Sequence, residues 1–205
     1  MGRRKYNPKS ILFLHEGYTE RDFYNKVFDV YLPKRKIRIH KHNLKGIYNL
    51  NKKVKAKISG ILEDRSHKEE KEFHVFVALD REGKREEESP LDLEGVRKEF
   101  IRKKSRIKSI NEIVATQDLE SWFFHDIDGI YNFLKVPVNQ RVLKVHNVEK
   151  FNNRNLQQLF RKHGQTYQKR GKNVEGFIEE LNLEKIYSNA FDLQKGIERM
   201  LLLFD

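Results

Sequence analysis

Apolar and polar positions in the first half of the chain follow two patterns, one typical of strands and one typical of helices. The apolar run Ile11–Leu14 is typical of a strand buried on both faces. Beyond it Phe23 and Val27 stand at helical spacing, and Thr19 is positioned to cap their helix. The same patterns predict strands at residues 10–15, 36–42, 73–79 and 108–116, with helices at 19–31, 47–62 and 91–100 between them.

Strands that alternate with helices in this way predict an α/β fold, with a parallel four-stranded sheet and helices on both faces. After about residue 118 the pattern becomes helical, with helices expected at 119–134, 156–163, 174–181 and 191–203. We therefore expect an α/β core over residues 1–125 and a C-terminal helical extension over residues 126–205, packed together as one compact unit. Ligands of such sheets bind beyond the carboxyl ends of the strands, so the residues at those ends matter most.

Acidic residues follow three of the four predicted strands. They are Glu16 and Glu20 after the first strand, Asp80 and Glu82 after the third, and Asp118 and Glu120 after the fourth. Carboxylates gathered at one edge repel one another, and one or two Mg²⁺ or Mn²⁺ ions would relieve that repulsion. Three structural alternatives stay open: Glu20 favours a helix dipole, Asp118 is placed to cap the helix that follows it, and Asp80-Arg81-Glu82-Gly83 is an ordinary acidic turn.

The charge balance favours a polyanionic partner. The 205 residues include 42 Lys and Arg against 30 Asp and Glu, a formal charge of +12. Basic side chains release counterions when they bind phosphates, so this excess indicates nucleic acid. Two basic runs are candidates for contacting its backbone, with a solvated surface as the alternative: Lys34, Arg35 and Lys36, and Arg102, Lys103, Lys104 and Arg106.

Several other classes of protein and site are disfavoured. The chain has no cysteine, which excludes disulfides and thiolate zinc sites. No apolar run approaches the roughly 20 residues of a membrane span, and we expect a cytoplasmic protein without a membrane partner. His40 and His42 alternate on a predicted strand, but no partner is spaced to complete a zinc site with them. The apolar run Trp122–Phe124 is expected to belong to the core.

Four separated segments together resemble one family. Residues 11–20, an apolar strand followed by Glu-Gly-Tyr-Thr-Glu, resemble the opening motif of the small TOPRIM proteins related to RloB and the OLD nucleases. Asp118–Trp122 resembles their later motif, an acid followed by Glu-x-Trp, and Tyr167-Gln168-Lys169 resembles their Tyr-x-Lys element. The family's third-strand pair is Asp-x-Asp, and here it is Asp80-Arg81-Glu82.

The resemblance implies a Rossmann-like TOPRIM fold, shared with topoisomerases and bacterial-type primases, and metal-dependent cleavage of phosphodiester bonds in defence or mobile-element biology. As the nucleic-acid partner, DNA is favoured over RNA, and the choice between them stays open. By resemblance Glu16 and Asp80 bind a first ion with help from Glu20 and Glu82, and Glu120 with Asp118 serves a second.

In the same family a lysine neutralises charge on the phosphate, and either Lys169 or Lys172 would do so here. The sequence has no Gly-rich phosphate-binding loop, so the ATPase that OLD nucleases carry would be a separate partner. Two alternatives stay open: a non-catalytic TOPRIM module that binds nucleic acid or a protein, and nucleotidyl transfer of the primase type.

Overall fold

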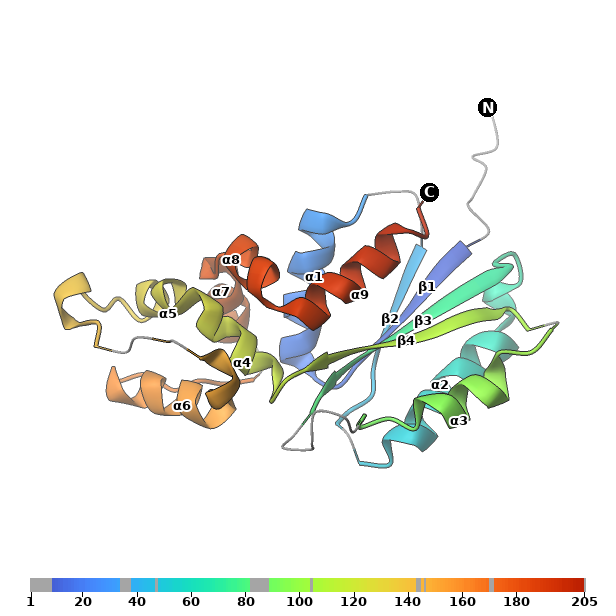
Figure 1. The fold of residues 1–205 in the computed structure, drawn as a ribbon, viewed down its shortest axis with the longest axis horizontal. Coiled ribbons are helices and arrows are strands. Elements are labelled where there is room, and N and C mark those ends of the chain that lie inside the picture. Colours follow the sequence, from blue (N-terminus) through green and yellow to red (C-terminus); the bar gives the residue numbers. More distant parts are fainter. Residues whose placement is uncertain are drawn as a thin grey trace.

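A four-stranded parallel sheet forms the centre of the molecule (Figure 1). The computed structural model describes residues 9–33, 38–46, 48–81, 89–103, 105–142, 145, 147–169 and 172–204. The strands are β1 (Lys9–His15), β2 (Arg38–Asn43), β3 (Glu72–Asp80) and β4 (Ile107–Ala115), in the order β2-β1-β3-β4. Every neighbouring pair is parallel, which confirms the predicted α/β class.

The central strands are buried on both faces, as their unbroken apolar runs predict. In β1, Ile11 and Phe13 belong to the core on one face of the sheet, whereas Leu12 and Leu14 belong to the core on the other. All four side chains are completely buried. This period of two divides the apolar side chains of each strand between two separate helical layers.

Each face of the sheet is covered by helices (Figure 1). Helices α1 (Tyr18–Tyr31) and α9 (Phe191–Leu201) lie on one face, and α2 (Leu50–Glu63) and α3 (Leu93–Phe100) lie on the other. Helix α9 packs closely on β4, because a Cβ atom added at Gly196 would come within 2.5 Å of the Ile113 side chain. The last helix of the chain therefore returns to the sheet.

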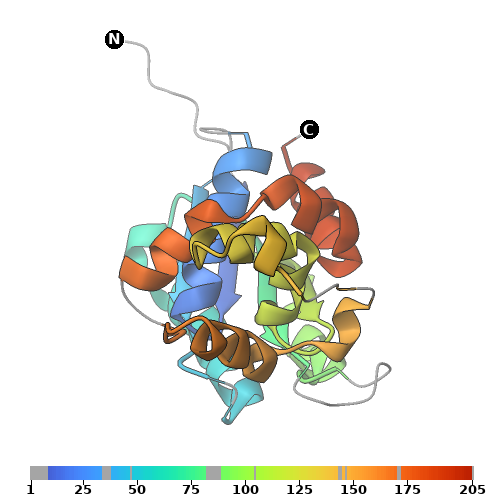
Figure 2. The ribbon, with the colours of Figure 1, turned by 90° about the vertical axis from the view of Figure 1, so that its left-hand side faces the viewer.

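The remaining helices gather beyond the carboxyl ends of the strands (Figures 1 and 2). They are α4 (Leu119–Phe123), α5 (Ile127–Phe133), α6 (Asn153–Lys162), α7 (Lys172–Glu180) and α8 (Leu183–Asn189). Short 3-10 turns lie between α4 and α6 along the chain: η2 (Phe124–Asp126), η3 (Val138–Gln140) and η4 (Val148–Lys150); another, η1 (Arg65–His67), precedes β3. Aromatic rings join these helices: Phe177 of α7 meets Phe123, Phe133 and Phe160 edge-on. Trp122, Phe123 and Phe124 are all buried, which confirms them as core residues.

The predicted helix at 119–134 is interrupted. It divides into α4, the turn η2 and α5. The interruption coincides with Asp126, whose Oδ2 accepts a hydrogen bond of 2.7 Å from the Asn182 amide and whose Oδ1 pairs with Lys185 at 3.1 Å. A buried aspartate that serves α8 in this way fixes the local backbone, and apolar spacing alone does not reveal it. Helix α8 itself was not predicted.

Two predicted helix starts are also wrong. Helix α1 begins at Tyr18 with Gly17 as its N-cap, and Thr19 lies inside it. The Thr19 hydroxyl instead donates to the Lys169 carbonyl at 3.3 Å, a contact across 150 residues. Helix α2 begins at Leu50, after Asn49 in the left-handed region (φ 54°).

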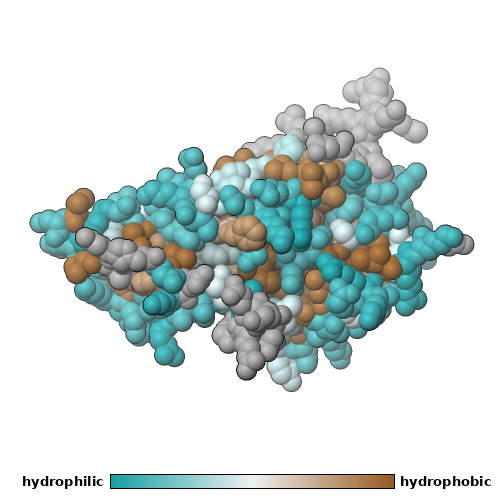
Figure 3. All heavy atoms as spheres, viewed as in Figure 1, coloured by the Kyte–Doolittle hydropathy of each residue, from teal (hydrophilic) through white to brown (hydrophobic). Residues whose placement is uncertain are grey.

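The visible surface is mainly hydrophilic, with hydrophobic residues scattered over it (Figure 3). Among the helices that the structure describes, none is both long and apolar enough to span a membrane. The division of the chain at residue 125 stays a prediction.

Candidate functional site

The carboxyl edge of the sheet brings Glu16 and Asp80 together. Strand β3 continues two residues past the point where His15 pairs with Ala78, so Asp80 reaches the turn that follows β1. The Asp80 amide donates to Glu16 Oε1 at 3.0 Å. Asp80 Oδ1 in turn accepts the Leu119 amide at 2.8 Å, at the start of α4. Hydrogen bonds from backbone amides to side-chain carboxylates thus connect the three predicted acidic segments.

Glu120 lies in the first turn of α4 and is completely buried. Its Oε1 accepts a hydrogen bond from the Tyr167 hydroxyl at 3.0 Å and lies 3.0 Å from Lys169 Nζ. Its Oε2 is buried and has no hydrogen-bond partner among the described residues. One oxygen of this carboxylate therefore has two partners, and the other is buried without one.

Glu20 completes the group from the first turn of α1. Its carboxylate folds back over Gly17, where an added Cβ atom would lie only 2.7 Å from Glu20 Oε2. Glycine thus permits the close approach of this side chain to the turn after β1. We use the name carboxylate cluster for Glu16, Glu20, Asp80, Asp118 and Glu120.

Asp118 both caps α4 and connects it to α6. Its Oδ1 accepts the Ser121 amide at 3.0 Å, and its Oδ2 accepts the Asn153 amide at 2.7 Å. The capping role that the sequence left open is confirmed. Burial and the charge of Glu120 together raise the pKa of Asp118 to about 6.

Two other acids of the cluster, Asp80 and Glu20, also have raised pKa values. Burial raises the pKa of Asp80 well above its usual value, and the charges of Glu20, Glu120 and Glu16 add to that effect. Burial also raises the pKa of Glu20, with a contribution from Glu120. Burial opposes the charge of Lys169, but the nearby carboxylates, Glu120 foremost, raise its pKa. The cluster therefore carries a repulsion that a cation would relieve.

The acids are close enough to interact but do not converge as tightly as a second group in the molecule. Within the described part of the chain, one set of three His, Asp or Glu residues has ligand atoms all within 4.8 Å of one another: His40, His67 and Glu70. It lies near the amino ends of the strands, at the opposite edge of the sheet. His40 stands out in the sequence, whereas His67 and Glu70 were not predicted; their His-x-x-Glu spacing is the local signal for them.

Part of the predicted site lies outside the described residues. This is the case for Glu82, Lys34, Arg35, Lys36 and Lys104. Lys172 is the first residue of α7, but its side chain is outside the description as well. The roles of these residues stay predictions.

The described members of the basic run lie far from the carboxylate cluster. Arg102, Lys103 and Arg106 precede β4 and so stand at the amino edge of the sheet, and the 9 residues of β4 separate them from Asp118. At about 3.3 Å per residue that distance is about 30 Å. The structure therefore does not bring these basic residues to the acids.

The Arg106 side chain is hydrogen-bonded to backbone carbonyls within the fold. Its guanidinium donates to the carbonyls of Leu62, His67 and Glu70 at 2.5, 2.7 and 3.2 Å, and it lies over the Phe73 ring. Arg102 and Lys103 are exposed. The nucleic-acid contacts of this run stay a prediction.

Comparisons of the chain with protein-family models, with curated proteins and with solved structures found no match.

Proposed function

We propose that the carboxylate cluster binds Mg²⁺ or Mn²⁺ and that the protein hydrolyses phosphodiester bonds of DNA as a nuclease of the TOPRIM type. The observation that supports this proposal most is Glu120. It is completely buried, yet its Oε2 has no hydrogen-bond partner among the described residues. Leaving a buried carboxylate oxygen unpaired costs free energy, and a hard cation is the partner that oxygen ligands of this kind suit.

The residues of the cluster offer the carboxylate oxygens that such ions prefer. Glu16 and Asp80 would hold one, with Glu20 beside them, and Glu120 with Asp118 would hold a second. Bound ions of this class lower the pKa of a coordinated water and stabilise charge on phosphate oxygens. The raised pKa values of Glu20, Asp80 and Asp118 are consistent with acids that bind a cation in the working protein.

Lys169 is the residue of the site best placed to contact substrate. Its side chain is 45% exposed while its ammonium touches the completely buried Glu120. Thr19 holds its backbone carbonyl, and Tyr167 orients the carboxylate that it meets. The ammonium would neutralise charge on a phosphate oxygen as the bond to the leaving oxygen breaks.

Cleavage assays test this proposal. The purified chain is incubated with plasmid DNA, single-stranded DNA and RNA, with Mg²⁺, with Mn²⁺ or with EDTA. We expect metal-dependent cleavage of DNA, reduced at least about 100-fold in Glu16→Gln and in Asp80→Asn, since lost charge stabilisation at a reacting centre has effects of that size. Asp92→Asn is the matched control, because Asp92 caps α3 in solvent outside the cluster. No cleavage by the native chain, or equal cleavage by Glu16→Gln, would exclude the proposal.

A second candidate is a non-catalytic module that binds nucleic acid. The ion pair between Lys169 and Glu120 favours it, because a lysine already supplies positive charge where a metal would. This candidate predicts DNA binding that weakens steeply with salt and does not depend on Mg²⁺. Calorimetric titration with Mg²⁺ separates the two functions: heat that disappears in Asp80→Asn supports the nuclease, and no heat in the native chain supports the module.

A further inference from the structure

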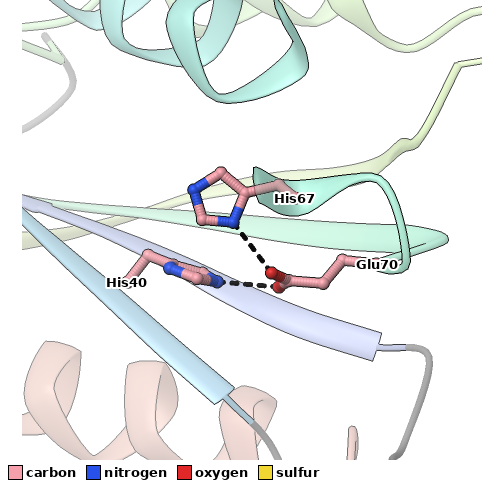
Figure 4. A group of neighbouring side chains, drawn as sticks. All are labelled: His40, His67 and Glu70. Carbon is pink, nitrogen blue, oxygen red and sulfur yellow. Dashed lines mark hydrogen bonds and ion pairs between the residues drawn. The ribbon is translucent and has the colours of Figure 1, made fainter. Parts of the chain in front are cut away.

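Two histidines and a glutamate meet near the amino ends of the strands, at the edge opposite the carboxylate cluster (Figure 4). His40 belongs to β2, His67 ends the turn η1, and Glu70 lies just before β3. Glu70 is buried and the two rings are nearly so, with 14% and 15% of their side chains exposed. Both rings direct a nitrogen at the same carboxylate (Figure 4).

The contacts within this group are short. His40 Nε2 lies 2.7 Å from Glu70 Oε2, and His67 Nδ1 lies 2.8 Å from Glu70 Oε1. The ligand atoms of all three residues fall within 4.8 Å of one another. We propose that His40, His67 and Glu70 form a binding site for a transition-metal cation of the Zn²⁺ class, separate from the carboxylate cluster and independent of its function.

The donor set selects this class of cation. Imidazole nitrogen suits Zn²⁺, whereas Mg²⁺ and Mn²⁺ prefer oxygen ligands. Two imidazoles and one carboxylate are a known zinc ligand set that leaves a fourth position for water. Around a tetrahedral ion with bonds of about 2.1 Å, ligand atoms stand about 3.4 Å apart. The two observed contacts of 2.7 and 2.8 Å need to lengthen by only about 0.6 to 0.7 Å.

The surrounding residues hold the ligands in place. Arg106 fixes the backbone of the turn through the carbonyls of His67 and Glu70, and Ser10 donates its hydroxyl to Glu70 Oε2. The second ring nitrogen of His67, Nε2, lies 3.7 Å from Asp64 Oδ2. Metal-binding histidines commonly have a carboxylate at the ring nitrogen that does not bind the metal, and this carboxylate orients the ring and raises its basicity.

The charges are compatible with a cation. Burial alone would raise the pKa of Glu70, but hydrogen bonds from Ser10, His40 and His67 hold it at about 2, so the carboxylate is ionised. Arg38 Nη1 also lies 3.3 Å from Glu70 Oε1, and its side chain is 49% exposed. It can turn into solvent when a cation enters.

Zinc titration of the full-length chain tests the proposal. The chain is first stripped with EDTA and then titrated with Zn²⁺ in excess Mg²⁺, with a chromogenic zinc chelator as competitor. We expect one equivalent of Zn²⁺ per chain. His40→Gln and Glu70→Gln should weaken binding by at least about 100-fold, since loss of a residue that merely hydrogen-bonds to a metal ligand already costs about 10- to 100-fold. His163→Gln, at the end of α6, is the matched control and should bind as the native chain does.

The variants also need a readout that does not depend on the chelator. Zn²⁺ should raise the unfolding temperature of the native chain and of His163→Gln but not that of His40→Gln, whose metal-free circular dichroism verifies that it is folded. Asp80→Asn should keep its zinc equivalent, so failure of the nuclease proposal leaves this one intact. No zinc binding by the native chain, or equal binding by His40→Gln, would overturn it.

Discussion

Asp118 should make the metal-free protein lose stability as the pH rises through about 6, its pKa in the folded chain. The cause is burial together with the charge of Glu120. Because the folded-state pKa lies above the value of 3.8 for a free aspartate, ionisation at higher pH penalises the folded state. The contribution of Asp118 to stability is complete below the unfolded pKa and is lost as the pH rises through the folded one.

The magnitude follows from the size of the shift. A rise of roughly 2 units corresponds to about 3 kcal/mol, of which about 2 kcal/mol falls between about pH 4.5 and 7. Asp118 is partly exposed, and solvent screening reduces the expected loss in that interval to about 1 to 2 kcal/mol.

The assay compares the native chain with Asp118→Asn. Urea unfolding in EDTA is followed by the fluorescence of Trp122, the single tryptophan of the chain and a buried residue. Burial lowers the pKa of several histidines, so their effect is opposite in sign: it makes the fold more stable as the pH rises over the same interval. These histidines are His15, His42, His74 and His125. These contributions cancel in the difference between the two proteins.

The free energy of unfolding of Asp118→Asn should rise relative to the native value by about 1 to 2 kcal/mol from pH 4.5 to 7. Asp92→Asn, which makes the same substitution at an exposed helix cap outside the cluster, is the matched control for the substitution itself. A difference that is constant with pH, or that moves the other way, would refute a raised pKa for Asp118.

Two further predictions concern the packing of the fold, and both are measured by urea unfolding at neutral pH. Gly196→Ala should cost about 1 to 3 kcal/mol, because its Cβ atom would meet Ile113 at 2.5 Å and push α9 from β4; Gly60→Ala, with no atom within 4 Å, should instead gain up to about 1 kcal/mol. Equal effects would contradict the tight contact of α9 with β4. Asp126→Ala should cost about 2 to 3 kcal/mol, since it removes the buried acceptor of the Asn182 amide. The same substitution at Asp128, which is 61% exposed, should lower the free energy of unfolding by less than about 1 kcal/mol. A similar loss of stability in both variants would count against the buried pairing of Asp126.

The sheet and the meeting of Glu16 with Asp80 follow from the sequence for one reason. Parallel strands end at a common edge, so acids that follow two neighbouring strands must come close, whatever the loops do. The apolar run of β1 followed by Glu16, and the apolar run of β3 followed by Asp80, are both local signals in the sequence. Together they predict that Glu16 and Asp80 lie at the same edge of the sheet. The same reasoning anticipates the cap formed by Asp118, because an N-cap lies directly before the helix that it serves.

Contacts between distant segments were not predictable in this way. Thr19 looks like a cap, but its hydroxyl serves a carbonyl 150 residues away. Arg106 looks like part of a phosphate-binding run, although its guanidinium is used by the turn before β3. His40 finds Glu70 only through the register of β2 beside β1, where His40 stands opposite Leu12. Helix α8, of 7 residues, is too short for its apolar spacing to stand out.

The position of Lys169 has a thermodynamic consequence. Its ammonium lies between the edge of the sheet and solvent, since it contacts Glu120 while nearly half of the lysine side chain is exposed. An anion that draws the ammonium outward leaves the negative charge of Glu120 without its positive partner. The carboxylate would then attract a cation more strongly. A cation on Glu120 in turn releases the ammonium for an anion. By linkage the two effects are equal in free energy, so anion and cation should bind this edge with positive cooperativity.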